Sequence, residues 1–252
     1  MAIAETAAER IEMARVVKRT FRAVEKNFVA FVVVSTPWGA IHAIEDQFVP
    51  PDVFSMIFGS VVFSPLSLPS VALLQGGVIH GVVASLNGKR ASVGGCLGTG
   101  LQYLWPMSLV GLLGTVAVMA GLVLLIVPGV ILTVMWVAAG AACVVEGTGV
   151  SGAFRRSVEL TRGYRWPIFG LFVALILFMF AFIFIVFLLV SLVAFSSNAA
   201  AALGTMVAQF VAVTISTMLF WTISSALGAA IYFELRQIKE GVGPEALASV
   251  FD

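Results

Sequence analysis

Long apolar runs that hold no charged residue leave this chain few ways to fold. Several runs reach 18 residues or more, and a run of that length is a candidate transmembrane helix. Charged residues make up 11% of the chain, against about 25% in a soluble domain, so a soluble fold would lack the polar residues to cover its surface. In hydrocarbon each span must satisfy its own backbone N–H and C=O groups, which favours helices. The sequence therefore predicts an all-α, polytopic membrane helix bundle.

Six spans are expected in a single membrane domain. They are Phe28 to about Ile44, about Leu66 to Leu86, about Leu101 to Ile126, Pro128 or Gly129 to Val145, Pro167 to Phe195, and about Leu203 to Phe233. The domain divides into a basic interfacial helix (residues 1–27), spans one to four (28–145), an arginine-rich interfacial elbow (146–166), spans five and six (167–233) and a tail (234–252).

The basic residues predict the orientation. All 14 Lys and Arg lie before span one, between spans two and three, between spans four and five, or after span six, and the other three loops contain none. Cytoplasmic loops are the ones that keep positive charge. We therefore expect both termini in the cytoplasm. This side would also hold Cys96 and Cys143, which we expect to be reduced.

The elbow predicts an amphipathic helix. Helical spacing gathers one weakly apolar face, made of Val150, Ala153, Phe154, Ser157, Val158 and Thr161. Arg155, Glu159 and Arg162 lie opposite, with Arg156 beside them, and Glu159 is spaced to pair with both Arg155 and Arg162. We expect this helix to lie in the cytoplasmic interface, with its arginines facing water and lipid phosphates.

The N-terminal segment repeats this design. A Trp-Pro pair ends the segment before the third span, Trp105-Pro106, and the elbow before the fifth span, Trp166-Pro167. These similarities predict a degenerate threefold unit, an interfacial helix followed by two spans. The expected partners are membrane lipids with anionic headgroups. The predicted headgroup-binding residues are Arg155, Arg156, Arg162, Arg165, Arg15, Lys18, Arg19 and Arg22.

One segment resembles a known family. "VVEGTGVSGAFRRSVELTRGYRWPIFGLF" is similar to the signature of a group of six-span bacterial inner-membrane proteins, which includes the membrane domain attached to some glycerophosphodiester phosphodiesterases. The matching positions are Glu146, Ala153, Arg156, Ser157, Gly163 and Trp166, and "LLIVPGVIL" resembles the family's Pro-Gly break between spans three and four. The resemblance implies the fold and a location in the bacterial inner membrane. It does not imply catalysis, because the phosphodiesterase activity of the fused members belongs to a separate soluble barrel.

Motifs for chemistry are missing from the sequence. It contains no Gly-x-Ser-x-Gly, His-Glu-x-x-His, Cys-x-x-Cys or Walker A pattern, so we expect no catalytic residue, no cofactor and no nucleic-acid partner. His42, Glu45 and Asp46 could bind a metal or proton weakly, but a solvated helix end is the favoured interpretation, and no metal site is predicted. The run "GGCLGTG" is better explained as a loop or helix start than as a phosphate loop.

The second span holds the most unusual polar residues. Gln75 and His80 could line a polar cavity, or could make packing hydrogen bonds. Pro65 and Pro69 are expected to divide Val53 to Leu86 into an outer piece and a true span. The broken helix would then line a transport path or, as we prefer, cover the bundle.

These features favour a non-enzymatic membrane protein that handles lipid or acts as an envelope or membrane-complex scaffold, with protein partners or a homo-oligomer left open. The alternative is a permease or channel for a small solute. It would not be proton-coupled, because no Asp, Glu, Lys or Arg lies near the middle of a span. A membrane-embedded enzyme is the least favoured class.

Overall fold

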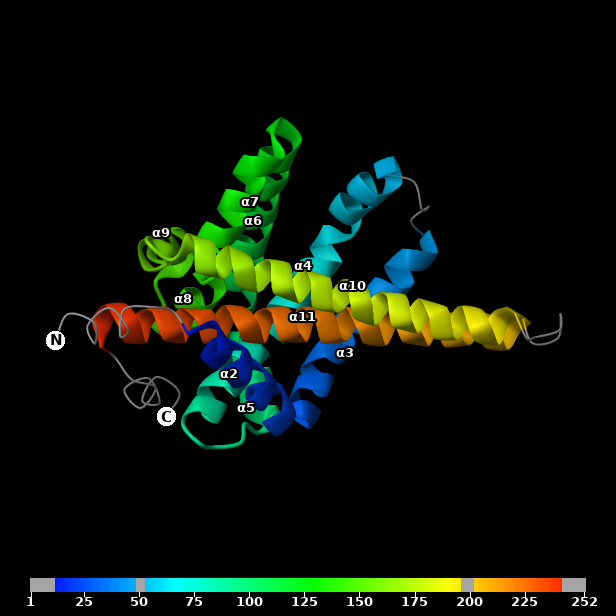
Figure 1. The fold of residues 1–252 in the computed structure, drawn as a ribbon, viewed down its shortest axis with the longest axis horizontal. Coiled ribbons are helices and arrows are strands. Elements are labelled where there is room, and N and C mark those ends of the chain that lie inside the picture. The colour runs from blue at the N-terminus through cyan, green and yellow to red at the C-terminus, as the bar shows by residue number, and fades with distance from the viewer. Residues whose placement is uncertain (1–11, 49–52, 196–201, 242–252) are drawn as a thin grey trace.

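The computed structural model describes residues 12–48, 53–195 and 202–241. This part of the chain is helical and has no strand, which confirms the predicted all-α bundle (Figure 1). The helices are α2 (Met13–Lys26), α3 (Phe28–Phe48), α4 (Val53–Leu86), α5 (Val93–Gln102), α6 (Leu104–Leu124), α7 (Ile126–Met135), α8 (Ala139–Glu146), α9 (Gly149–Thr161), α10 (Arg165–Phe195) and α11 (Ala202–Glu240).

The order of these helices follows the predicted threefold unit. A short helix precedes two long apolar segments three times, beginning at α2, α5 and α9. The three pairs are α3 and α4, α6 with α7 and α8, and α10 and α11. In the second pair, α7 and α8 together form one segment, which a three-residue interruption at 136–138 divides. The short helices are therefore the elements that introduce each hairpin of spans.

Five helical segments in the described residues are long and apolar enough to cross a membrane. They are Ser67–Leu86, Leu104–Leu124, Ile126–Glu146, Arg165–Leu189 and Phe210–Glu240. Each overlaps one of the predicted spans. The first predicted span falls on α3, whose apolar part, Phe28–Ala43, is shorter.

The predicted break of the second span is wrong. One α-helix runs from Val53 to Leu86, through both Pro65 and Pro69. A proline removes one backbone hydrogen bond, and a membrane helix tolerates this loss where neighbouring groups replace it. Ser70 donates its hydroxyl to the Ser67 carbonyl at 2.7 Å, but this carbonyl is not four residues before either proline, so the bond does not replace one that a proline removes.

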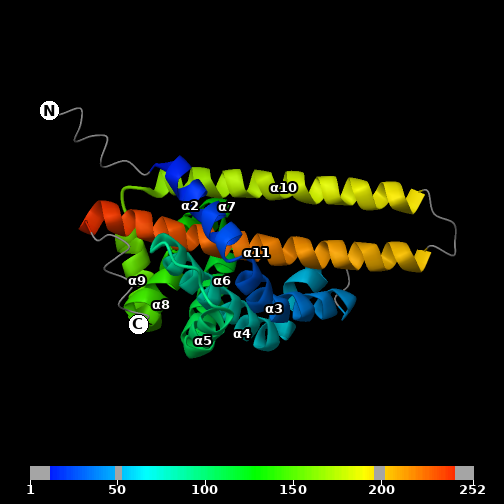
Figure 2. The same cartoon turned by 90° about the horizontal axis from the view of Figure 1, so that it is seen from below.

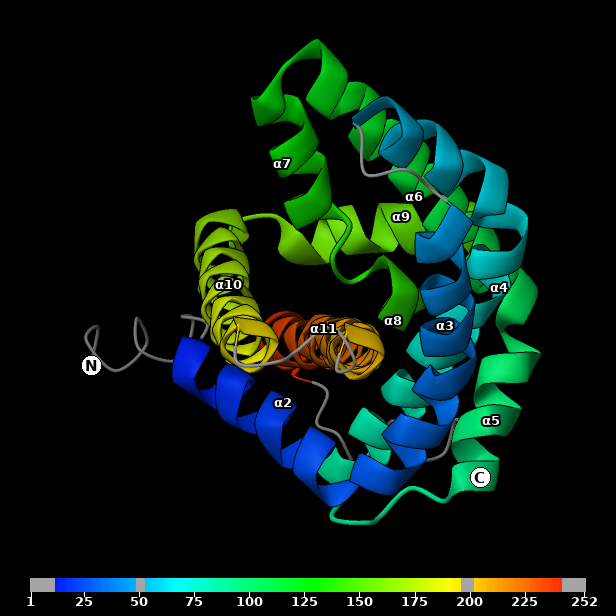
Figure 3. The ribbon, with the colours of Figure 1, turned by 90° about the vertical axis from the view of Figure 1, so that its right-hand side faces the viewer.

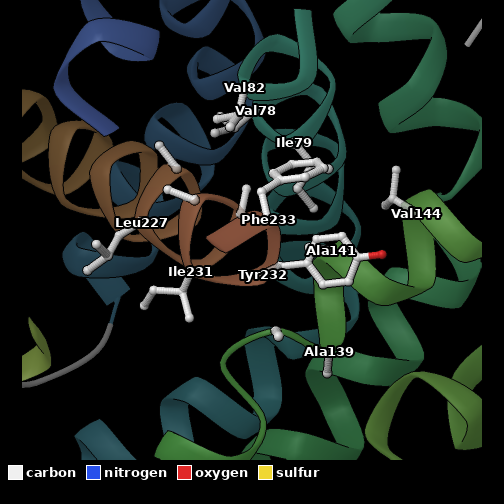
Figure 4. Close-up of a cluster of buried hydrophobic side chains, with 14 of the residues drawn as sticks. Val78, Ile79, Val82, Ala139, Ala141, Val144, Leu227, Ile231, Tyr232 and Phe233 are labelled. Atoms are coloured by element: carbon white, nitrogen blue, oxygen red, sulfur yellow. The ribbon is translucent and has the colours of Figure 1, made fainter. Parts of the chain in front are cut away.

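The core forms around α11, which packs against α2, α3, α4, α8, α9 and α10. Figure 4 shows Phe233 and Tyr232 on the side of α11 that faces α4 and α8, while Leu227 and Ile231, also buried, point to its other side. The fourth predicted span is rich in small residues, and its Ala138, Ala139, Ala141 and Ala142 are buried. Small side chains allow helices to approach closely, so α8 reaches the middle of the bundle.

The α10–α11 hairpin extends beyond the rest of the bundle (Figures 1 and 2). Helix α10 has 31 residues and α11 has 39. At about 1.5 Å per residue the longer helix spans about 58 Å. Phe180, Phe184 and Phe187 are more than 60% exposed, as expected for a helix that faces lipid.

Candidate functional site

The elbow forms a helix, α9, with the predicted buried face. Ala153, Ser157 and Thr161 are buried, and Arg155 pairs with Glu159 at 3.1 Å. Gly163 follows the helix with a φ of +92°, a conformation that favours glycine. The described residues show no ion pair between Glu159 and Arg162, so only one of the two predicted pairs forms.

The polar residues on the buried face of α9 stabilise the interruption between α7 and α8. Ser157 donates its hydroxyl to the Met135 carbonyl at 2.7 Å and accepts a hydrogen bond from the Ala138 N–H at 3.2 Å. Helix ends leave such backbone groups without partners, and burying them unpaired is costly. Ser157, singled out in the sequence through the family resemblance, therefore bridges the broken span.

A cluster of charges joins α8, α9 and α11. Glu146 accepts hydrogen bonds from Arg156 Nε at 2.9 Å and from the Tyr232 hydroxyl at 2.7 Å. Arg156 also pairs with Glu240, which receives a hydrogen bond from Arg236 at 2.9 Å. Burial lowers the pKa of Arg156, but its hydrogen bonds to the two carboxylates outweigh this effect and raise it above the ordinary value. The cluster fixes the three helices to one another.

A second charged cluster joins α2 to α11. Glu234 is 1% exposed, and its two carboxylate oxygens accept hydrogen bonds from Arg15 at 3.2 Å and Arg19 at 2.5 Å. Lys239 donates to the carbonyls of Glu159 and Arg162 at the end of α9. Together these contacts gather α2, α9 and the C-terminal part of α11 at one end of the molecule, which we call the basic end.

These clusters correct one expectation. Arg156 lies between two carboxylates and does not simply face water and lipid, as we expected of the elbow arginines. Arg15 and Arg19 are likewise held by Glu234. The other residues predicted to bind headgroups are exposed, except Arg165, which is half-buried; they are Lys18, Arg22, Arg155, Arg162 and Arg165. The sequence did not indicate Glu234 or Tyr232, because a single polar residue at the end of a span does not reveal its partner.

An apolar groove of about 580 Å³ lies between α7 and the start of α10. One wall is a face of α7 with Val127, Val130, Ile131 and Val134, and the other holds Arg165, Trp166 and Phe169. Trp166 is 82% exposed. The Nε atom of Arg165 is buried and has no hydrogen-bond partner in the described structure. The groove therefore combines a long apolar wall with one unsatisfied cationic donor.

A second, partly open cavity of about 360 Å³ lies inside the bundle. Its walls come from α4, α6, α7, α8, α9, α10 and α11, and Figure 3 shows the long helices placed around α8 and α9. Gln75 lines it, as predicted. His80 does not: its Nδ1 lies 3.0 Å from the Thr99 hydroxyl, between α4 and α5. The two residues proposed together from the sequence thus have separate surroundings.

The remaining candidates show no site for a metal. The part of the chain that the structure describes has no group of three His, Cys, Asp or Glu side chains that could hold one. His42 lies 3.7 Å from Glu45. The glycine run lies in α5, whose first turn is capped by Ser92, so it forms a helix.

The long apolar helices and their packing define a polytopic helical membrane protein. The chain belongs to the family described as "Domain of unknown function (DUF7847)", whose model matches residues 39–235. No curated protein and no solved structure matches the chain. The relationship to the membrane domain of glycerophosphodiester phosphodiesterases stays a prediction.

Proposed function

We propose that this protein is a non-enzymatic protein of the bacterial inner membrane, with both termini cytoplasmic, that handles lipid by holding an anionic phospholipid in the α7–α10 groove. The observation that carries the proposal is Arg165, whose Nε is buried without a partner at the edge of an apolar groove. The phosphate would accept hydrogen bonds from the guanidinium, and an acyl chain would lie along α7. Arginine is well suited to this contact because its donors match the oxygens of a phosphate.

The surroundings of Arg165 favour a lipid over a soluble anion. Trp166 is exposed beside it, and tryptophan is enriched at the level of the headgroups. The wall of α7 offers apolar side chains only, such as Val130 and Ile131, which suit hydrocarbon. Arg165 also begins α10, and the positive end of a helix dipole favours an anion there.

Exposed cations nearby would add a less specific attraction. Arg155 and Arg162 on and after α9, and Lys18 and Arg22 on α2, are exposed. Each contributes about 1 kcal/mol near an anionic surface. These residues would draw anionic lipid to the basic end, while Arg165 would hold one molecule.

The test compares Arg165→Gln with Arg155→Gln. Both remove one positive charge from the same segment, but Arg155 lies away from the groove and pairs with Glu159. Purified, delipidated protein is titrated with phosphatidylglycerol, and binding is followed by tryptophan fluorescence, to which Trp166 contributes. We expect Arg165→Gln to weaken binding by about tenfold or more, the effect of losing a hydrogen bond to a charged group. Arg155→Gln should bind like the wild type.

Two further measurements make the result decisive. Val130→Trp fills the groove without changing charge and should also weaken binding, whereas phosphatidylcholine should bind the wild type less tightly than phosphatidylglycerol does. Equal losses in Arg165→Gln and Arg155→Gln would show that only general charge matters. Unchanged binding in both Arg165→Gln and Val130→Trp would overturn the groove as the lipid site.

A further inference from the structure

Two hydrogen-bonding side chains, Gln75 from α4 and Ser225 from α11, line the same cavity. The Ser225 hydroxyl is buried and has no partner among the described residues. Gln75 is half-buried and presents its amide, which can give two hydrogen bonds and accept two, on the same cavity. Buried polar groups are nearly always hydrogen-bonded, so the unpaired Ser225 hydroxyl on the same cavity as the Gln75 amide points to a molecule that occupies the cavity.

The lining of the cavity selects the kind of molecule. No charged side chain lines it, and its other polar side-chain groups are the hydroxyls of Thr115, Thr133 and Ser224 and the indole N–H groups of Trp136 and Trp221. An ion brought here would lose its hydration without gaining a counter-charge, which is costly in a low-dielectric interior. Aromatic side chains, including Trp136, Phe154 and Trp221, supply apolar surface between the polar groups. This combination is typical of sites for small molecules, in which a few polar groups set the orientation.

From this geometry we infer that the cavity is a binding site for a small uncharged polar molecule of the polyol or amide class, held between Gln75 on α4 and Ser225 on α11. The volume of about 360 Å³ is ample for a molecule of that size. This site is separate from the α7–α10 groove, since the two share no lining residue. It is also the kind of site that a permease for a neutral solute requires.

The test places a reactive thiol in the cavity. Ser225→Cys is treated with methyl methanethiosulfonate, which is small and uncharged, or with its trimethylammonium-ethyl counterpart, which is permanently charged. Ser151→Cys, exposed on α9, is the matched control. The wild-type chain gives the background, which should be low because Cys96 and Cys143 are buried and burial raises the pKa of the Cys96 thiol to about 11.

We expect the neutral reagent to modify both variants. The charged reagent should modify Ser225→Cys at least about tenfold more slowly than the neutral reagent does, because losing its hydration water is costly. Glycerol and urea are the probes for binding. Either one at its dissociation constant should slow modification of Ser225→Cys by roughly twofold while leaving Ser151→Cys unchanged. Gln75→Leu, introduced into Ser225→Cys, should remove this protection without preventing modification.

Thr115→Cys, on the α6 wall, repeats the experiment if Ser225→Cys fails to fold. Equal rates of modification of the cavity cysteine by the neutral and the charged reagent would overturn the inference that the cavity excludes charged molecules. The absence of protection by both glycerol and urea, or protection that survives Gln75→Leu, would overturn the binding site. None of these outcomes depends on lipid binding at Arg165, so the two proposals stand or fall separately.

Discussion

Glu234 is the residue whose surroundings most constrain the basic end. Its carboxylate is almost completely buried and depends on Arg15 and Arg19 for its hydrogen bonds. Removing one partner of a buried charge costs more than the pair contributes, because the remaining charge is left without compensation. The stability of the α2–α11 contact should therefore be sensitive to single substitutions at this point.

Arg19→Gln should destabilise the protein by about 1–3 kcal/mol, since Arg19 makes the shorter of the two bonds to Glu234. The measurement is the thermal unfolding midpoint in detergent. Arg22→Gln is the matched control, because Arg22 is an exposed arginine on the same helix. Adding Glu234→Gln to Arg19→Gln should recover part of the loss. Equal midpoints for Arg19→Gln and Arg22→Gln would contradict the assignment.

At this scale the sequence predicts residue types better than partners. Helical periodicity correctly placed Ala153 and Ser157 on the buried face of α9. It could not show that Arg156 meets Glu240, because those residues are 84 positions apart and only the tertiary fold brings them together. Gln75 was identified as a cavity residue because an amide in a span is costly unless it has a partner or a ligand.

Among the elements, the interrupted pair α7–α8 behaves least like a simple span. Its interruption at 136–138 leaves backbone groups without helical partners. Ser157 of α9 donates to the Met135 carbonyl before the interruption and accepts from the Ala138 N–H at its end. The sequence predicted a continuous span here and an interrupted one at Pro65 and Pro69, and the structure reverses the two. Proline predicts a break from local sterics, whereas the break after α7 depends on a partner that is 19 residues further along the chain.

Ser157→Ala should lower stability by about 1–3 kcal/mol, because it leaves the buried Ala138 N–H without its acceptor. Ser151→Ala, at an exposed position on the same helix, should change little. Thermal unfolding in detergent measures both. Ser157→Thr, which keeps the hydroxyl, should lie between them. A midpoint for Ser157→Ala equal to that of Ser151→Ala would exclude this role for the serine.

For the whole molecule, the contacts gather basic segments that are distant in the sequence. Arg19 meets Glu234 and Gln237, Lys26 donates to the Gly88 carbonyl, and Arg156 meets Glu240. The elements that carry most of the Lys and Arg therefore share one end of the bundle. This arrangement agrees with the charge segregation along the chain, which predicts that this end faces the cytoplasm.

Reporter fusions test that orientation. Fusions after Arg90, after Arg165 and at Asp252 should report the cytoplasm, while fusions near Asp52 and Asn198 should report the opposite side, because every basic residue is assigned to the cytoplasmic loops. Asp52, Asn198 and Asp252 lie outside the described residues. A cytoplasmic signal at Asn198 would contradict the six-span arrangement.

The contact between Ser157 and the interrupted span also has a consequence for synthesis. While the chain is being made, the backbone groups of Met135 and Ala138 leave the ribosome before the serine that satisfies them. At about 5–20 residues per second, the serine follows within roughly one to four seconds. Until then the interruption is better placed in water or beside the insertion machinery than in hydrocarbon. The fourth span should therefore settle into the membrane only as α9 emerges, which couples the completion of one hairpin to the start of the next.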